Sequence, residues 1–186
     1  MNKNQIIRPG TLGPHGTSSE QATLYCVQSL MKVKVDNLSL YDTFDDVLTS
    51  LVNDKINIAV VPHAYEGINK FYINPQLELQ QMFIHDTPRY GIYKSPGVML
   101  QNKHCMIVSH PAPVVLMEYL IAKQVEITQY TVDLVNSTSV AASMVHDRKV
   151  EAAITNENAA KLYNLELLAM YGPIRMGWSV FRRSES

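Results

Sequence analysis

Short β-branched runs alternate along this chain with segments in which apolar residues recur at helical spacing. One such segment follows Asp42-Thr43 and extends from Phe44 to Leu51, and the largely apolar run from Ile56 to Val61 then predicts a buried strand. Alternation of this kind is typical of βα units around parallel sheets. The pattern therefore predicts an α/β fold.

A second helix is predicted to begin at Thr17. The run Thr17-Ser18-Ser19-Glu20 fits a capping box, in which the Thr17 hydroxyl and the Glu20 carboxylate bond backbone N–H groups of the first turn. Leu24, Val27 and Met31 then follow on one face of the predicted helix.

The two halves of the chain repeat each other approximately. A shift of 94 residues places 43–61 over 137–155, so that apolar positions fall on apolar positions. A shift of 95 places the loop containing His15 over the loop containing His110, which predicts equivalent positions for the two histidines. Any two βα units look alike at this level, so chance similarity is one interpretation. The other is two lobes of like topology that share a cleft.

Ligands of open α/β sheets bind beyond the carboxyl ends of the strands, where loops lead into helices. Helix N-termini carry unpaired N–H groups and partial positive charge, so they hold anions without Lys or Arg. The sequence offers three such termini rich in Ser and Thr, at 17–19, 42–43 and 137–139. They suit a small polyanion such as a dicarboxylate.

Composition narrows the class of partner. Lys+Arg 16 and Asp+Glu 17 nearly cancel, so we expect no binding to nucleic acid and none to an anionic membrane. No apolar run approaches the roughly 20 residues that span a bilayer. Cys26 and Cys105 are isolated, and the first residues show no secretion signal, so a cytoplasmic location is expected. No metal-binding cluster or phosphate-binding motif is present in the sequence.

Five segments resemble, in order and spacing, the catalytic domain of prephenate dehydratases: GTLGPHGTSSEQA (10–22), IAVVPHAYEG (58–67), IVSHPAP (107–113), NSTSVAASMV (136–145) and AAITNENAAKLYNLELLA (152–169). The resemblance covers nearly the whole chain. It implies one domain over 1–186 with the two-lobed fold of type II periplasmic binding proteins. We expect lobe 1 to comprise 1–84 and 170–186, lobe 2 to comprise 85–169, and no room to remain for an ACT domain.

The departures from that family lie where its chemistry resides. Dehydratases carry Glu-Asn-Ser where this chain has His63-Ala64-Tyr65-Glu66, and they carry a Thr-Arg-Phe in the stretch that reads Met176-Gly177-Trp178-Ser179-Val180-Phe181 here. Four segments resemble the branch of non-aromatising prephenate decarboxylases of the bacilysin and aeruginosin type: VPHAYEGINKFY (61–72), DTPRYG (86–91), VNSTS (135–139) and WSVF (178–181). That resemblance implies loss of the ring carboxylate as CO2, protonation of a ring carbon and retention of the 4-hydroxyl. The implied product is dihydro-4-hydroxyphenylpyruvate for antibiotic-type biosynthesis, formed without a cofactor because the substrate takes up its own electrons.

Candidate residues follow from these segments. His63 is the first candidate for general acid or substrate orienter because it follows a strand end and histidine changes charge near neutral pH; Tyr65 and Ser179 complete the catalytic set. The candidates for substrate binding are His15, Thr17, Ser18, Ser19, Arg89, His110, Ser137, Thr138, Ser139, Asn156 and Arg175. Each has an ordinary alternative, such as a helix cap, a hydrogen-bonded structural histidine or a solvated arginine. Tyr90 and Trp178 fit either a wall for the ring or the core.

Two other functions stay open from the sequence. A dehydratase could use another acid, with Ser179 as one choice, and would form phenylpyruvate. A ligand-binding domain could keep the cleft without catalysis. A homodimer is expected only because it is the commonest assembly for proteins of this size.

Overall fold

The computed structural model describes residues 6–33, 37–100, 104–124 and 126–184. Contacts divide them into two units: one holds 1–13, 19–86 and 175–186 as far as these are described, and the other 14–18 and 87–174. The divisions at 86/87 and 174/175 compare with expected boundaries at 84/85 and 169/170. Residues 14–18, expected in the first lobe, group with the second unit.

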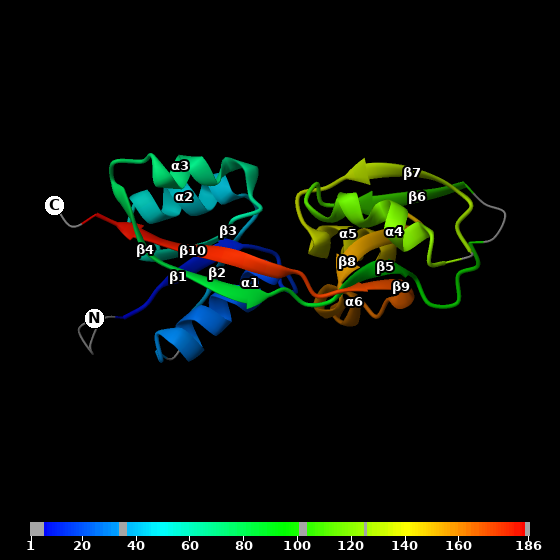
Figure 1. The fold of residues 1–186 in the computed structure, drawn as a ribbon, viewed down its shortest axis with the longest axis horizontal. Helices are drawn as coiled ribbons and strands as arrows, with labels where there is room; N and C mark the ends of the chain where they lie inside the picture. The colour runs from blue at the N-terminus through cyan, green and yellow to red at the C-terminus, as the bar shows by residue number, and fades with distance from the viewer. Residues whose placement is uncertain (1–5, 34–36, 101–103, 125, 185–186) are drawn as a thin grey trace. The chain divides into compact units, whose positions relative to one another are not determined.

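The first unit is a five-stranded sheet in the order β2-β1-β3-β10-β4 (Figure 1). Strands β2, β1 and β3 are parallel, whereas β10 runs antiparallel to its neighbours β3 and β4. The elements are β1 (Pro9–Leu12), α1 (Ser18–Tyr25), a π-helical turn (Cys26–Leu30), β2 (Ser39–Tyr41), α2 (Phe44–Val52), β3 (Ile58–Pro62), a 3₁₀ turn (Glu66–Ile68), α3 (Asn69–Tyr72), β4 (Leu77–Asp86) and β10 (Arg175–Arg183).

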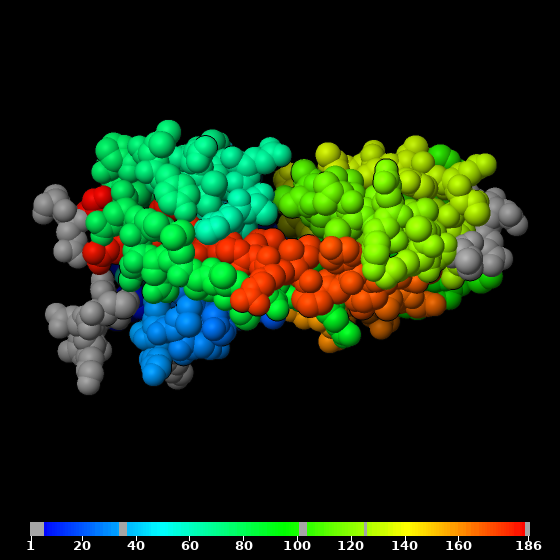
Figure 2. All heavy atoms as spheres, viewed as in Figure 1, coloured from blue at the N-terminus to red at the C-terminus, as the bar shows by residue number. Residues whose placement is uncertain are grey.

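Helices cover both faces of this sheet. Ala59, Val61 and Phe181 pack with α2 and α3, whereas Val60 and Trp178 pack with α1, as the alternation of side chains along a strand requires. Side chains of the α2 and α3 segment lie directly beside those of β10 on the face seen in Figure 2. The α/β prediction is confirmed for this unit.

The second unit repeats this plan in the order β7-β6-β8-β5-β9. Strands β6, β7 and β8 are parallel, and β5 runs antiparallel to β8 and β9. The elements are β5 (Tyr90–Lys94), β6 (His104–Ser109), a 3₁₀ turn (Pro113–Leu116), α4 (Met117–Ile121), β7 (Gln129–Leu134), α5 (Thr138–His146), β8 (Ala152–Asn156), α6 (Glu157–Leu162) and β9 (Glu166–Gly172).

The internal repeat is therefore real. The bounds of α2 and β3 fall on those of α5 and β8 at the predicted shift of 94. Asp54 and Arg148, equivalent at this shift, both have positive φ, 57° and 58°. The two βα units share a turn residue with positive φ at the same position, and their sheets share one strand order. This agreement excludes chance similarity. The two lobes of like topology are confirmed.

The predicted equivalence of His15 and His110 is wrong. Gly10 pairs with Ala59 in the first sheet, and Val108 pairs with Ala153, the equivalent of Ala59, in the second. Gly10 therefore corresponds to Val108, a shift of 98 rather than 95. Strand pairing fixes which residues are equivalent. The connections that follow β1 and β6 differ in length, and a single shift along the sequence cannot account for such a difference.

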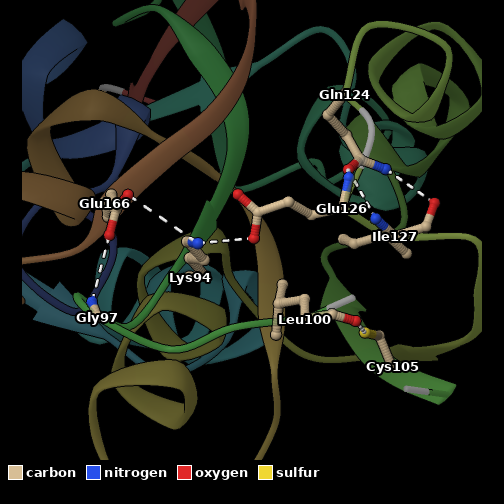
Figure 3. Close-up of polar contacts among 8 residues, drawn as sticks. All are labelled: Lys94, Gly97, Leu100, Cys105, Gln124, Glu126, Ile127 and Glu166. Carbon is tan, nitrogen blue, oxygen red and sulfur yellow. Dashed lines mark hydrogen bonds and ion pairs between the residues drawn. The ribbon is translucent and has the colours of Figure 1, made fainter. Parts of the chain in front are cut away.

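A buried lysine braces the second unit. Lys94, at the end of β5, is 4% exposed, and its ammonium lies 2.7 Å from Glu126 Oε2 and 4.0 Å from Glu166 Oε1 (Figure 3). Glu166 also accepts a hydrogen bond from the Gly97 amide. Lys94 thus holds the loop of Glu126 to the sheet, and Glu166 at the start of β9 holds the loop of Gly97.

We expect Glu126→Ala to lower the free energy of unfolding by about 3 kcal/mol, because it leaves a buried ammonium without its close partner. Lys94→Met should cost less, since the Glu126 and Glu166 side chains are 25% and 50% exposed and water can solvate them. Urea unfolding of both variants checks the order, and a larger loss in Lys94→Met would contradict it.

Candidate active site

A polar cluster lies at the carboxyl end of β3. His63 follows the strand directly, and its amide donates to the Gly177 carbonyl of β10 at 2.9 Å. The imidazole lies over Gly177, where a Cβ would come within 2.4 Å of His63 Nδ1. Any residue other than glycine at 177 would therefore displace the His63 imidazole from the strand.

His63 is joined to two hydroxyl groups. Its Nε2 lies 2.9 Å from Ser179 Oγ, and the Tyr72 hydroxyl lies 2.7 Å from the same Oγ. Ser179 is fully buried, whereas His63 is exposed and Tyr72 is 43% exposed. The cluster thus presents an imidazole and a phenol to the outside, connected through a serine that cannot itself reach a ligand.

The sequence analysis missed Tyr72. The residue ends the short helix α3, and its ring packs edge-on against Phe181 at 4.9 Å between centroids. Nothing in the local pattern singles it out, since packing of α3 on β10 brings it to Ser179, 107 residues further along the chain.

Tyr65 does not join the cluster. Its ring packs on Phe44 at 4.5 Å, and its hydroxyl is hydrogen-bonded to Asp45. Burial, followed by the charge of Asp45, raises the pKa of the Tyr65 phenol. The structure therefore brings together two of the three predicted catalytic residues, His63 and Ser179.

A second polar cluster lies at the carboxyl ends of the parallel strands of the other unit. It is built around the segment 14–18, whose backbone is held by side chains of α5 and β8. Ser139 Oγ donates to the His15 carbonyl, and Asn156 Nδ2 donates to the Gly16 carbonyl at 3.0 Å. Gly16 has a φ of +89°, which favours glycine, and a Cβ there would lie 3.1 Å from the Ala159 backbone.

Asn156 is the central residue of this second cluster. It is fully buried, and its Oδ1 caps α6 by accepting from the amides of Asn158 and Ala159 at 2.9 and 3.1 Å. Its Nδ2 also lies 3.3 Å from Thr138 Oγ1. One side chain thereby fixes the start of α6, the start of α5 and the segment 14–18.

Tyr90 closes the cluster from β5. Its buried hydroxyl lies 2.9 Å from Ser18 Oγ and is also hydrogen-bonded to Thr138. Burial raises the pKa of this phenol. Tyr90 is therefore both part of the core and polar support for two predicted binding residues.

Arg89 is already paired within the chain. Its guanidinium donates to Glu157 through Nε and Nη2 at 3.1 and 2.8 Å. The Glu157 amide in turn donates to the Arg89 carbonyl. Hydrogen bonds from Arg89 lower the pKa of the Glu157 carboxyl to about 2. At the shift of 94, Glu157 is the equivalent of His63, so the repeat places a closed ion pair where the first unit has its imidazole.

This pair predicts a pH effect on stability. Because the folded pKa of Glu157 lies below the ordinary 4.5, its stabilising contribution is present above pH 4.5 and is lost as the pH falls toward 2. We expect Glu157→Gln to weaken the dependence of the unfolding free energy on pH between 6 and 3. Denaturant titrations at both pH values measure it, with Glu118→Gln on α4 as control; an unchanged slope in Glu157→Gln would contradict the assignment.

The other predicted residues are placed as follows. Thr17, Ser19 and Ser137 are buried at or beside helix N-termini, and Ser137 Oγ caps α5 by accepting from the Val140 amide. Helix α1 begins at Ser18, directly after the predicted Thr17. His15 and Arg175 are exposed, whereas His110 Nδ1 accepts from the Ala112 amide in its own loop. Trp178 is 1% exposed and donates to the His85 carbonyl, so it belongs to the core.

Among the described residues, no three His, Cys, Asp or Glu side chains lie together as metal ligands. Within the same part of the chain, no helix is long and apolar enough to cross a membrane.

Solved structures share this fold. A prephenate dehydratase from Arthrobacter aurescens, in complex with L-Phe, superposes with a TM-score of 0.71 at 18% identity, over 97% of this chain and 61% of that one. A periplasmic substrate-binding protein of an ABC transporter from Coxiella burnetii superposes with a TM-score of 0.59 at 13% identity, over 96% and 85%. The fold is thus the predicted one of prephenate dehydratases and periplasmic binding proteins.

Sequence comparison gives the family. No protein-family model matches the chain. A prephenate decarboxylase from Planktothrix agardhii is 42% identical over 175 residues, which cover 94% of this chain and 87% of that protein. One from Bacillus subtilis is 40% identical over 187 residues, covering 98% and 89%. The chain belongs to the prephenate decarboxylase family.

Proposed function

We propose that this protein is a carboxy-lyase that decarboxylates prephenate and leaves the ring non-aromatic. Prephenate carries a carboxylate and a pyruvyl arm on one quaternary ring carbon and a hydroxyl on the opposite carbon. As CO2 leaves, its bonding electrons move into the ring and the far carbon of a neighbouring double bond takes a proton. The product is dihydro-4-hydroxyphenylpyruvate, with the hydroxyl retained.

The observation that carries the proposal is the state of Ser179. The resemblance implies that dehydratases have in this stretch a Thr that helps to expel the ring hydroxyl. Here the hydroxyl group is fully buried and already bound by His63 and Tyr72. Losing a well-placed acid typically slows a step about 10²- to 10⁴-fold, so dehydration is suppressed while decarboxylation survives.

The two clusters have different tasks in this proposal. In the first, His63 is the source of the proton that the reaction consumes, since its exposed imidazole can take up protons from water. In the second, the N–H groups at the start of α5 bind a carboxylate, because the first turn of a helix leaves such donors unpaired. Ser139 and Asn156 hold the segment 14–18 beside that turn, where Thr17 and Ser18 contribute further polar groups.

The remaining binding residues fit the same scheme. Further contacts with the substrate are proposed for His15, Ser19, His110 and Arg175. Arg89 contributes through Glu157, the partner to which it is bound.

We further propose a cytoplasmic enzyme of secondary metabolism that feeds an antibiotic-type pathway and acts as a homodimer. The resemblance of the sequence segments to the bacilysin and aeruginosin type supports the metabolic role. Sedimentation analysis tests the assembly.

Incubation with prephenate tests the function. Formation of dihydro-4-hydroxyphenylpyruvate with release of CO2 is the expected result. Phenylpyruvate as the main product would overturn the proposal in favour of a dehydratase, and tight binding without turnover would overturn it in favour of a binding domain.

A further inference from the structure

Tyr72 stands at one end of a three-membered chain of polar groups, with His63 at the other end and Ser179 in the middle. We propose that Tyr72 delivers the proton to the ring carbon and is recharged by His63 through Ser179. This inference rests on the proposed decarboxylation and assigns its proton donor.

The exposures determine what each group can do. Ser179 is fully buried and cannot touch a substrate, so its hydroxyl acts only on its two neighbours. A serine hydroxyl has one proton and accepts through its lone pairs. Ser179 can therefore accept a proton from His63 Nε2 while it gives its own to the Tyr72 oxygen. The separations of 2.9 and 2.7 Å are those of normal hydrogen bonds along this path.

The step balances in atoms and charge. The bond between the quaternary carbon and its carboxylate breaks, CO2 leaves, and the electron pair shifts through the ring to the far carbon. That carbon takes the Tyr72 proton. The phenolate regains a proton from Ser179, which takes one from the His63 imidazolium, and water recharges His63. One proton is consumed in each turnover.

This order also accounts for retention of the alcohol. The carbon that accepts the proton is bonded to the carbon that bears the hydroxyl, so any donor to one can approach the other. Expelling a neutral alcohol needs a strong acid, whereas a ring carbon that gains electrons accepts a proton from a weak one. A phenol is a much weaker acid than an imidazolium. In the proposed order the phenol of Tyr72, and not the exposed imidazolium of His63, donates to the ring carbon.

Strand β4, which pairs with β10 beside Ser179, offers a surface for the ring of the substrate. Met82 lies directly opposite Ser179 in the antiparallel pair of β4 and β10, and Ile84 lies opposite Gly177. Directly opposed residues share a face of the sheet, so both apolar side chains lie on the face that carries Ser179 and His63. Each is 60% exposed, which leaves an apolar surface beside Ser179 and Gly177 for the hydrocarbon edge of the substrate.

The test uses Tyr72→Phe and Ser179→Ala in the full chain, with Tyr119→Phe, an exposed tyrosine of α4, as control. We expect each of the first two to lower kcat about 10²-fold or more with KM changed less than about threefold. Because the groups act as one path, the double variant should lose no more than either single variant. Ser179→Thr, which keeps a hydroxyl, should recover most of the rate.

Two results would overturn the proposal: Tyr72→Phe that keeps kcat within about threefold of the parent, or losses that multiply in the double variant. Urea unfolding of each variant separates loss of activity from loss of folding. Where Ser179→Ala does not fold, the rate of Ser179→Thr is measured in its place. Failure of the parent protein to form the dihydro product would instead overturn the proposed function itself.

Discussion

Replacing His63 by Gln should lower kcat for release of CO2 from prephenate about 10²- to 10⁴-fold, with a smaller change in KM. Gln keeps a polar group near Ser179 but cannot carry the proton that the reaction consumes. The fold should survive, since His63 is exposed and its backbone amide still bonds the Gly177 carbonyl. CO2 release measured against prephenate concentration gives both constants.

Two further variants separate the presence of the imidazole from its position. Gly177→Ala keeps the histidine, but the new Cβ would lie 2.4 Å from His63 Nδ1 and must displace the ring. It should therefore also lower kcat. His104→Gln, in an exposed histidine on β6, should leave kcat unchanged. Full activity in His63→Gln would remove the histidine from the mechanism.

Replacing Asn156 by Ala should lower the free energy of unfolding by about 2–4 kcal/mol and raise KM about tenfold. The change removes the cap of α6 and leaves the Gly16 carbonyl without its donor. The segment 14–18 then loses one of the side-chain contacts that hold it beside the start of α5, while the bond from Ser139 remains. A tenfold rise in KM corresponds to about 1.4 kcal/mol of lost binding.

Asn158→Ala is the matched control, because it makes the same substitution two residues away in α6. Among the described residues its side chain caps no helix, so we expect stability within about 0.5 kcal/mol of the parent. Urea unfolding and the dependence of rate on prephenate concentration measure both effects. An unchanged KM in Asn156→Ala would show that the segment 14–18 does not contribute to substrate binding.

The elements with strong local signals were predictable. Thr43 caps α2 as its sequence indicates, through a bond from the Asp46 amide, and β3 follows where the apolar run predicted a strand. The repeat was found because α2 and α5 bury the same positions, Val47 with Ala141 and Leu51 with Val145. Periodicity and caps act within a few residues, so a single sequence records them.

The candidate site was predictable only in part. His63 and Ser179 stood out because they replace the residues of a known family. Tyr72 carried no such mark, and Tyr65, which did stand out, is bonded to Asp45 instead. Arg89 looked free to bind a carboxylate, but the structure gives it one from its own chain in Glu157. Which of several tyrosines or arginines meets a given partner depends on strands paired far apart in sequence.

By itself the sequence determined the α/β class, the positions of the main helices and strands, the internal repeat and the resemblance to prephenate decarboxylases, all of which depend on local order along the chain. Tertiary structure decided the register of the first strands and the partners of the polar groups. The pairing of β10 with β3 joins Ser179 to His63 and Tyr72 across 116 and 107 residues. Hydrogen bonds of a few ångströms between such distant residues are fixed by the packing of the whole sheet, and no local pattern encodes them.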